Sequence, residues 1–414
     1  MFKNRRSIIL IFILALSMRV LWVVIAKSYI YIQAWEYEDI AVNLLNGHGF
    51  AYSHLGTVYY SFVQPLYPFF CAAVYFITNH SFLVLTLLQV FISAFICIII
   101  FKIADIVFNR YVAILSAILV ALHPGVIIYT AKLHPFVLDT FFISLVALVF
   151  LHLNSDFSIR NQIIAGIVSG FCILTRSTIA LFLIFVIIWF FYNGIYSKKR
   201  VILGGLVILF TSFIVILPWT IRNYIIHRQF IFIQTNVGEV FWRGNNSNAS
   251  GSSYKINGRT ILESSSVEFL KKLYSLDEMG QNRLFREEAV NFIKQHPFKC
   301  VSLFIKKNYY FWWFSPQSGI EYPRGYLLIY KILYSGILLF AISGIIFSLS
   351  SKISNIRWNA WLILFLLISI SFAQSFFYVE GRHRWAVEPL LLIFTAYGLI
   401  EIKHKVNKCL KMKT

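Results

Sequence analysis

Charged residues, and acidic residues above all, are scarce in this sequence. Asp, Glu, Lys and Arg together make up only 13% of the chain, while hydrophobic residues make up 59%. A soluble domain contains about 25% charged and about 45–50% apolar residues, so a soluble globular protein is excluded. The apolar residues form repeated runs of about 17–25 residues, the length that spans the hydrocarbon core of a bilayer. The sequence therefore predicts an all-α polytopic membrane protein.

Cysteine is also rare, and its distribution argues against two kinds of site. The five cysteines lie far apart, and no two have the spacing of metal ligands or of a redox motif. We therefore expect neither a disulfide framework nor a zinc site. His123-Pro124 and His134-Pro135 flank one short turn, but lone histidines of this kind are seldom metal ligands. No metal ion and no other cofactor is expected.

The excess of basic over acidic residues, 37 against 17, does not indicate a nucleic-acid partner. Much of the positive charge lies in short loops between apolar runs, where the positive-inside rule places it. About ten spans are predicted. They lie at about 8–26, 81–101, 112–129, 136–153, 162–174, 178–193, 201–217, 326–348, 358–375 and 386–401.

The basic loops also predict the orientation. With the N-terminus inside, the loops that carry Lys102, Arg160, Lys199 and Lys352 all face the cytoplasm, as does the tail from Lys403. The first apolar run is too long for a signal peptide and contains a charge, so we expect a retained anchor. Both termini are then cytoplasmic, in what we expect to be a bacterial or archaeal plasma membrane.

Two loop regions are predicted on the outer face. Residues 1–217 form an N-terminal membrane module whose first outer loop is 27–80, residues 218–325 form a second outer region with a helical pattern, and residues 326–414 return to the membrane. The run 65–78 is apolar, but counting it as a span would place basic loops outside. It is shorter than a span and begins with prolines, so a juxtamembrane or re-entrant helix is predicted.

Three carboxylates, Glu36, Glu38 and Asp39, follow the first apolar run directly. On a helix that begins near Trp35, Glu36 and Asp39 share one face, while Glu38 points elsewhere. A carboxylate at an outer membrane pocket can act as general base on an acceptor hydroxyl. Acidic residues also stabilise a helix N-terminus against its dipole, and spacing alone leaves both interpretations open.

Four arginines are candidates to bind an anion. Arg176 interrupts two short apolar runs, where a charge faces a cavity or a partner such as Asp139. Arg382 and Arg384 lie on the predicted outer side, where they suit a phosphate or ordinary lipid headgroups. Arg222 follows a Pro-Trp pair and can contact a phosphate or snorkel to the interface.

These residues, taken in order, resemble the family 39 glycosyltransferases of the C-type superfamily, which includes protein O-mannosyltransferases and lipid A aminoarabinose transferases. The resemblance covers most of residues 8–400 and rests on short motifs in the family's order on one predicted face. The motifs are Glu36-Tyr37 with Gly47 and Gly49-Phe50, Pro65-Leu66-Tyr67-Pro68, Leu174-Thr175-Arg176, Leu217-Pro218-Trp219 with Arg222-Asn223, Gly244-Asn245-Asn246, Arg286-Glu287-Glu288-Ala289 with His296-Pro297, and Arg382-His383-Arg384 before Glu388-Pro389.

The resemblance implies an inverting transferase that moves a sugar from a polyprenyl-phosphate carrier in the bilayer to a glycan, lipid or protein acceptor on the outer face, without a metal ion. Glu36 is expected to be the catalytic base, with Asp39 in reserve. Substrate binding is expected from a larger group of polar side chains. These are Tyr37, Tyr67, Arg176, Arg222, Asn245, Asn246, Arg382 and Arg384.

Two positions depart from the family pattern. The family's usual first-loop aspartate is replaced by Gln33, which moves the expected base by one helical turn to Glu36. The lysine that often precedes the paired prolines is replaced by Val63, followed by Gln64. Phosphate binding is therefore expected to rest on arginines.

Two other functions stay open at this stage. A flippase or transporter of lipid-linked saccharides also needs intramembrane charge, although transporters typically contain internal repeats and none is present here. A catalytically inactive scaffold with a transferase fold is the second alternative, and Gln33 keeps it open. A metal-dependent oligosaccharide transferase is disfavoured, because no cluster of acidic ligands follows the first loop.

Overall fold

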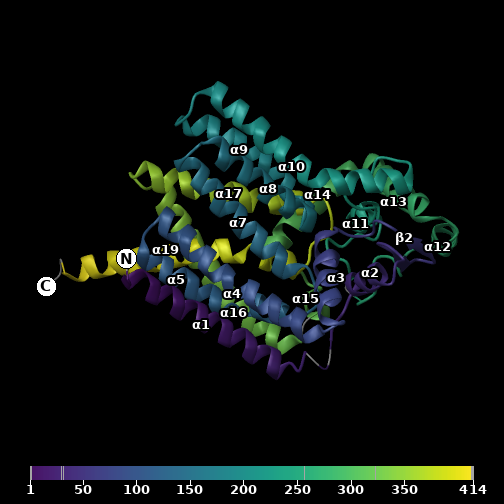
Figure 1. The fold of residues 1–414 in the computed structure, drawn as a ribbon, viewed down its shortest axis with the longest axis horizontal. Coiled ribbons are helices and arrows are strands. Elements are labelled where there is room, and N and C mark those ends of the chain that lie inside the picture. Colours follow the sequence, from purple (N-terminus) through teal and green to yellow (C-terminus); the bar gives the residue numbers. More distant parts are fainter. Residues whose placement is uncertain (1, 29, 31, 256, 322, 412–414) are drawn as a thin grey trace.

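The computed structural model describes residues 2–28, 30, 32–255, 257–321 and 323–411 as a mainly helical protein (Figure 1). Long apolar helices run along the molecule, and both termini lie at one end. The helices of this bundle are α1 (Phe2–Ile25), α4 (Phe82–Val107), α5 (Arg110–Ala121), α6 (Pro124–Ile128), α7 (Phe136–Ser155), α8 (Ile159–Thr175), α9 (Ala180–Asn193), α10 (Lys198–His227), α16 (Arg324–Leu349), α17 (Ser354–Gln374) and α19 (Glu388–Lys411).

Smaller elements gather at the end of the molecule opposite the termini (Figure 1). They are α2 (Glu36–Leu45), β1 (Tyr52–His54), β2 (Thr57–Tyr59), α3 (Leu66–Thr78), α11 (Val237–Gly244), α12 (Val267–Tyr274), α13 (Glu278–Gln295), α14 (Pro297–Trp312), α15 (Ser318–Glu321) and α18 (Gly381–Trp385), with short 3₁₀ turns η1 (Tyr129–Ala131) and η2 (Ser177–Ile179) in the bundle. The only sheet in the described residues is the antiparallel hairpin β1–β2, in which Tyr52 pairs with Tyr59.

The predicted all-α polytopic architecture is confirmed, but the count of ten spans is not. Every predicted span falls on a helix, yet only six helices of the described residues are long and apolar enough to cross a membrane, or seven if the bent pair α5 and α6 counts as one span. Helices α8 and α9 are shorter. The charges Glu401, Lys403 and Lys405 follow only a short apolar run in α19. Helix α3 has 13 residues and begins after Pro65, as the sequence predicted.

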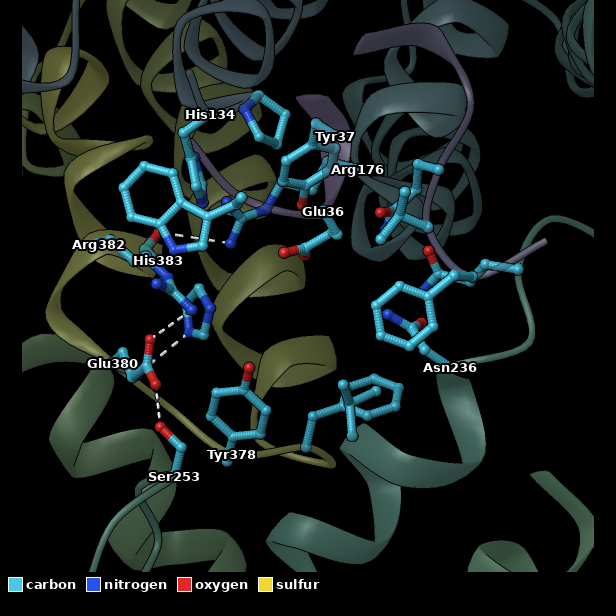
Figure 2. Close-up of a pocket in the computed structure, with 18 of the residues that line it drawn as sticks. Glu36, Tyr37, His134, Arg176, Asn236, Ser253, Tyr378, Glu380, Arg382 and His383 are labelled. Carbon is cyan, nitrogen blue, oxygen red and sulfur yellow. Dashed lines mark hydrogen bonds and ion pairs between the residues drawn. The ribbon is translucent and has the colours of Figure 1, made fainter. Parts of the chain in front are cut away.

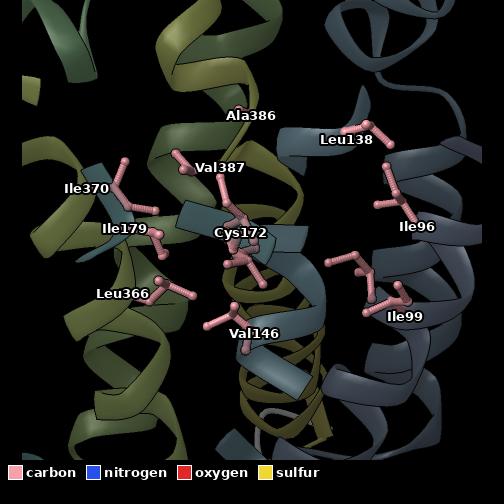
Figure 3. Packing of buried hydrophobic residues seen from close by; sticks show 14 of the residues in the cluster. Ile96, Ile99, Leu138, Val146, Cys172, Ile179, Leu366, Ile370, Ala386 and Val387 are labelled. Carbon is pink, nitrogen blue, oxygen red and sulfur yellow. The ribbon is translucent and has the colours of Figure 1, made fainter. Parts of the chain in front are cut away.

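The core of the bundle is built from interlocking aliphatic and aromatic side chains. Figure 3 shows its centre, where Val146 of α7 and Cys172 of α8 meet Ile179 and the α17 residues Leu366 and Ile370. Helices α8 and α10 pack closely, because Gly166 and Gly170 of α8 have no side chain to keep them apart. This packed bundle provides a rigid base for the loops above it.

The two predicted outer regions form a single layer, which we call the cap (residues 36–65 and 231–295). Glu278 at the start of α13 accepts hydrogen bonds from the backbone amides of Tyr60 (2.7 Å) and Ser61 (3.1 Å). A small separate core of Trp242, Phe285 and their neighbours lies within the second region. Helix α10 continues to His227, so the predicted boundary at residue 217 lies inside a helix rather than between domains.

Candidate active site

The cap and the bundle enclose a cavity of about 580 Å³. Its walls come from segments far apart in the sequence, which Figure 2 shows converging on one space. The lining residues that carry polar or aromatic groups include Trp35, Glu36, Tyr37, Tyr52, His54, Gln64, Lys132, His134, Asp139, Arg176, Gln234, Asn236, Glu239, Arg243, Tyr378, Glu380, Arg382 and His383. The predicted site residues Glu36, Tyr37, Arg176 and Arg382 are therefore brought together.

The three adjacent carboxylates of α2 enter three different environments. The Glu36 side chain points into the cavity (Figure 2). Glu38 is buried behind α2, where it accepts hydrogen bonds from the Tyr75 hydroxyl and contacts His80 Nε2 at 2.7 Å. Asp39 is exposed and does not line the cavity, because three residues of helix move it about 4.5 Å along the axis. Of the two residues predicted as candidates for the catalytic base, Glu36 therefore lines the cavity and Asp39 does not.

Glu36 is a partly buried carboxylate with no ion-pair partner among the described residues. Burial raises its pKa, and the positive charges of Arg382, His54 and Arg243 oppose this shift. Every other acidic residue that lines the cavity is paired with an arginine. Glu36 is consequently the one lining carboxylate, within the described part of the chain, that is available for another proton donor.

Three arginine–carboxylate pairs line the cavity. Arg176 lies 3.7 Å from Asp139, which is the partner that the sequence suggested. Arg382 lies 2.6 Å from Glu380, across the first turn of α18. The third pair, Arg243 and Glu239, stands one turn apart on α11. Paired arginines keep unused N–H donors, so each can still meet an anion in the cavity.

Arg176 ends α8 at the break between two short helices. Its side chain is buried, and besides Asp139 it donates to Thr178 Oγ1 (3.2 Å), to Gln374 Oε1 (3.4 Å) and to the carbonyl oxygen of His383 (3.4 Å). These bonds tie the α8–α9 break to α17 and α18. Arg176 therefore holds the cavity wall together in addition to contributing charge.

Two histidines of the cavity, His134 and His383, have pKa values well below the usual histidine value. Burial lowers the pKa of His134 well below its usual value, and the charges of Arg382, Lys132 and Arg176 lower it further. Burial has the same effect on His383, with Arg382, Arg176 and His134 contributing next. The positive charge on this side of the cavity consequently comes from arginine and lysine rather than from histidine.

Arg384 does not reach the cavity, contrary to the prediction. Its Nε donates to Glu388 Oε1 at 2.6 Å, and its guanidinium lies 3.8 Å from the centre of the Tyr334 ring. Glu388 also contacts His123 and Tyr330, so these five side chains form one buried cluster. Two residues of helix turn Arg384 about 200° away from Arg382, which explains why the neighbouring arginines face opposite sides.

Arg222 is also directed elsewhere. It donates to the carbonyl oxygen of Tyr60 and to Ser61 Oγ (2.9 Å), and it lies over the Trp219 ring at 4.6 Å. Next to it, the Asn223 amide donates to the carbonyl oxygen of Ile233 at 3.0 Å. Arg222 and Asn223 therefore hold two loop segments of the cap in place, near residues 60–61 and near residue 233. This structural role accounts for the Arg-Asn motif without a bound phosphate.

The remaining predicted binding residues are engaged within the protein. Tyr67 is buried, and its hydroxyl donates to Gln89 at 2.8 Å while its ring packs edge-on against Tyr37. The Asn245 amide donates to two carbonyl oxygens, and its own oxygen accepts from Lys307 at 3.2 Å. The Asn246 amide donates to the carbonyl oxygen of Trp242 at 2.7 Å. None of the three lines the cavity.

Several lining residues were missed by the sequence prediction. Lys132 lies over the rings of Tyr129 (5.0 Å) and Trp35 (5.7 Å) at the edge of the cavity. Glu239 and Arg243 are four residues apart, an i, i+4 spacing that could have identified them. His54 of the hairpin contacts Glu239 at 3.0 Å, a pairing that no local pattern encodes. Among the described residues, no group of three or more His, Cys, Asp or Glu is placed to hold a metal ion.

The structure also shows where the residues that depart from the family pattern lie. Val63 and Gln64 line the cavity. The position at which the family often has a lysine is therefore at the cavity, but its side chain is uncharged here. Gln33 is exposed and does not line the cavity, whereas its backbone oxygen accepts from Leu133 at 3.2 Å. The substitution at residue 33 therefore leaves Glu36 as the first-loop carboxylate in the cavity.

Comparison with known proteins connects this architecture to membrane transferases. Residues 63–219 match the family model described as dolichyl-phosphate-mannose-protein mannosyltransferase. This stretch includes Arg176 but neither Glu36 nor Arg382. No curated protein sequence matches.

Solved structures extend the likeness to the whole chain. The archaeal oligosaccharyltransferase AglB from Archaeoglobus fulgidus, in complex with an inhibitory peptide and a dolichol-phosphate, is 14% identical, with a TM-score of 0.56 over 100% of this chain and 52% of that one. Its apo form gives a TM-score of 0.57 at 14% identity over 98% of this chain and 51% of that one. ArnT from Cupriavidus metallidurans, bound to undecaprenyl phosphate, is 12% identical, with a TM-score of 0.43 over 92% and 77%.

The chain spans about half the length of the oligosaccharyltransferase whose fold it shares. At this identity the likeness concerns the fold, while the family match adds a sequence signal over residues 63–219. Together, the match to a mannosyltransferase family model and the shared fold confirm the predicted resemblance of this chain to the C-type membrane glycosyltransferases.

Proposed function

We propose that this protein is an inverting membrane glycosyltransferase, which moves a sugar from a polyprenyl-phosphate carrier to an acceptor hydroxyl on the outer face of the membrane. The observation that carries the proposal is Glu36, which has no ion-pair partner among the described residues, in a cavity whose other carboxylates there are each paired with an arginine. The mannosyltransferase family match supports the reaction class.

Glu36 is the proposed general base. A base must reach the acceptor hydroxyl and must have a pKa near the working pH, and burial moves the pKa of Glu36 upward in that direction. Its position at the first turn of α2 keeps the backbone fixed while the carboxylate projects into the cavity. Asp39 becomes a supporting residue of the helix N-terminus.

Arg382 and Arg176 are the proposed contacts for the carrier phosphate. Both line the cavity on the side of the bundle, and Figure 2 shows them near His134 and His383. A guanidinium offers a planar pair of donors that matches phosphate oxygens. Arg384 and Arg222 are not assigned this role here, because neither lines the cavity and both make hydrogen bonds within the protein.

The proposed reaction uses Glu36 as the base and Arg382 and Arg176 as the contacts for the phosphate. The acceptor hydroxyl gives its proton to Glu36, its oxygen bonds to the anomeric carbon, and the bond from that carbon to the phosphate oxygen breaks. Polyprenyl phosphate leaves with the bonding electrons, and Arg382 and Arg176 stabilise its growing charge. A single displacement of this kind inverts the anomeric configuration.

The experiment is turnover by purified protein in lipid nanodiscs. Polyprenyl-phosphate-linked hexoses and pentoses are offered with a mixture of hydroxyl-bearing acceptors, and release of polyprenyl phosphate is measured. The proposal expects release that depends on acceptor and a product of inverted configuration. Movement of the intact lipid-linked sugar across the bilayer without release would identify a flippase, and the absence of both would identify an inactive scaffold.

A further inference from the structure

Beyond the arginine pairs, part of the cavity wall is neutral and rich in hydrogen-bond acceptors. Gln234 and Asn236 lie on the segment that leads into α11, and Tyr52 lies on the hairpin. In Figure 2, Asn236 lies on the other side of the Glu36 carboxylate from Arg382. We propose that Gln234, Asn236 and Tyr52 form a subsite for the sugar ring of a neutral carbohydrate acceptor. This inference rests on the proposed function.

Asn236 is placed for a ligand rather than for the helix that it precedes. It occupies the N-cap position of α11, where asparagine normally accepts a hydrogen bond from a backbone amide, yet its side chain makes no such bond. Asn282 of α13 takes over this role and accepts from the Gly238 amide at 3.0 Å. The Asn236 Oδ1 is left buried without a hydrogen-bond partner among the described residues.

Gln234 has the same property. Its Oε1 is buried and has no hydrogen-bond partner in the described part of the chain. The backbone on both sides is fixed, because the carbonyl oxygen of Ile233 accepts from Trp219 and Asn223, and the Thr235 amide donates to the carbonyl oxygen of Ser61 at 2.8 Å. Gln234 and Asn236 both line the cavity, and the side-chain oxygen of each lacks a hydrogen-bond donor among the described residues.

A buried acceptor without a partner is costly, so a donor from a ligand is the expected compensation. An amide oxygen only accepts, which selects for hydroxyl or N–H groups on that ligand. Gln234, Asn236 and Tyr52 carry no charge of their own, so this part of the wall does not compensate an ionic ligand group. A polyhydroxylated neutral molecule fits these conditions, and a cavity of about 580 Å³ has room for a sugar ring.

The hairpin adds an aromatic surface to this wall. The Tyr52 ring lies 5.0 Å from that of Phe62 and 5.8 Å from that of His54, and all three residues line the cavity. Burial raises the pKa of the Tyr52 phenol, and the charges of Glu36 and Asp39 raise it further, so the phenol stays neutral. The electron-rich face of an aromatic ring attracts the C–H groups of a sugar ring.

Binding can be measured without turnover. Neutral methyl glycosides of hexoses and pentoses are tested by saturation-transfer NMR on the full chain in nanodiscs, with a serine- and threonine-containing peptide as the alternative acceptor class. We expect glycoside binding that becomes about tenfold or more weaker in Gln234→Leu, Asn236→Leu and Tyr52→Ala. Tyr52→Phe keeps the ring and should bind nearly as wild type. The matched control is Gln295→Leu, an exposed amide on α13, which should change nothing.

A second measurement does not depend on the variants folding. Wild-type protein should bind deoxy glycosides less tightly than the parent at one or more ring positions, because the lost hydroxyl leaves an amide oxygen unpaired. Glycosides that fail to bind wild type, or that bind the two leucine variants unchanged, would overturn the subsite. Preference for the peptide over every glycoside would also overturn it.

The outcomes separate this inference from the proposed function. Glu36→Gln removes the basicity that turnover requires but leaves Gln234, Asn236 and Tyr52 in place, so glycosides should still bind to a variant that has lost turnover. Glycoside binding without turnover of any polyprenyl-phosphate sugar would support the subsite and contradict the transferase. Turnover with the peptide as sole acceptor would support the transferase and contradict the subsite.

Discussion

At the scale of single residues, the two arginines of the Arg-His-Arg motif have different environments. Arg382 lines the cavity, while Arg384 is buried against Glu388 and aromatic rings. The motif predicts both as phosphate ligands, and only the structure shows that Arg382 lines the cavity while Arg384 lies in a buried cluster. The difference leads to opposite expectations for the two alanine variants.

We expect Arg382→Ala to weaken donor binding, with Arg382→Lys restoring only part, because a point charge cannot reproduce the planar pair of donors. Arg384→Ala leaves Glu388 buried without that partner and should lower the free energy of unfolding by about 3–5 kcal/mol. Thermal unfolding and binding of a polyprenyl-phosphate sugar measure the two effects. Unchanged donor affinity in Arg382→Ala would shift the phosphate site to Arg176.

The raised pKa of Glu36 predicts the pH dependence of the reaction. A general base acts when deprotonated, so activity should be lost as the pH falls through the Glu36 pKa, which burial places above the usual glutamate value. The acid limb of kcat/KM should therefore lie at higher pH than that expected for an exposed glutamate. A profile that stays flat down to the ordinary glutamate range would contradict the assignment of Glu36 as the base.

At the scale of elements, the contact between α8 and α10 depends on two glycines one turn apart. A Cβ on Gly166 would lie 2.6 Å from the carbonyl oxygen of Ile208, and one on Gly170 would lie 2.9 Å from that of Ser212. Small residues at this spacing allow helices in membranes to approach closely. Because Arg176 ends α8, this contact also positions one wall of the cavity.

Gly166→Ala should therefore lower the free energy of unfolding by about 1–3 kcal/mol, since backbone atoms must move to admit the methyl group. The matched control is Gly336→Ala on α16, where nothing lies within 4 Å of the added carbon and no loss is expected. Thermal unfolding in detergent compares the two variants. Equal stability of both would show that the helices separate easily at this point.

The helices were largely predictable from sequence, whereas the cavity was not. Apolar runs and proline breaks located the bundle helices and α3, because these signals are local. Glu36 and Arg382 were predicted from motifs that happen to face the cavity. Gln234 and Asn236 carry no local signal, since their role depends on Asn282 taking the cap of α11. Arg222 was predicted to bind substrate, and its contacts with residues 60 and 61 could not be foreseen because they require the folded cap.

At the scale of the whole molecule, the cap and both termini lie at opposite ends of the helical bundle. Figure 1 shows the two termini at one end and β2, α12 and α13 at the opposite end. The positive-inside rule predicts that the end with the termini is cytoplasmic.

Cysteine-accessibility labelling in a cysteine-free background tests this orientation. Cysteines placed at Gly47, Ser250 and Asp277 should react with an impermeant reagent from outside, and those at Lys199, Lys352 and Lys408 only from the cytoplasm. Labelling of position 250 from the cytoplasm alone would reverse the orientation and place the proposed reaction on the wrong face.

The most direct test of the proposed function is the turnover number of Glu36→Gln with a polyprenyl-phosphate sugar and acceptor. The substitution keeps the shape of the side chain and its place in the cavity but removes its basicity, so turnover should fall by about 10²–10⁴-fold while donor binding is retained. Asp39→Asn, on the exposed face of the same helix, should be nearly neutral. Near-normal turnover in Glu36→Gln would contradict the account, and a loss confined to Asp39→Asn would make Asp39 the base.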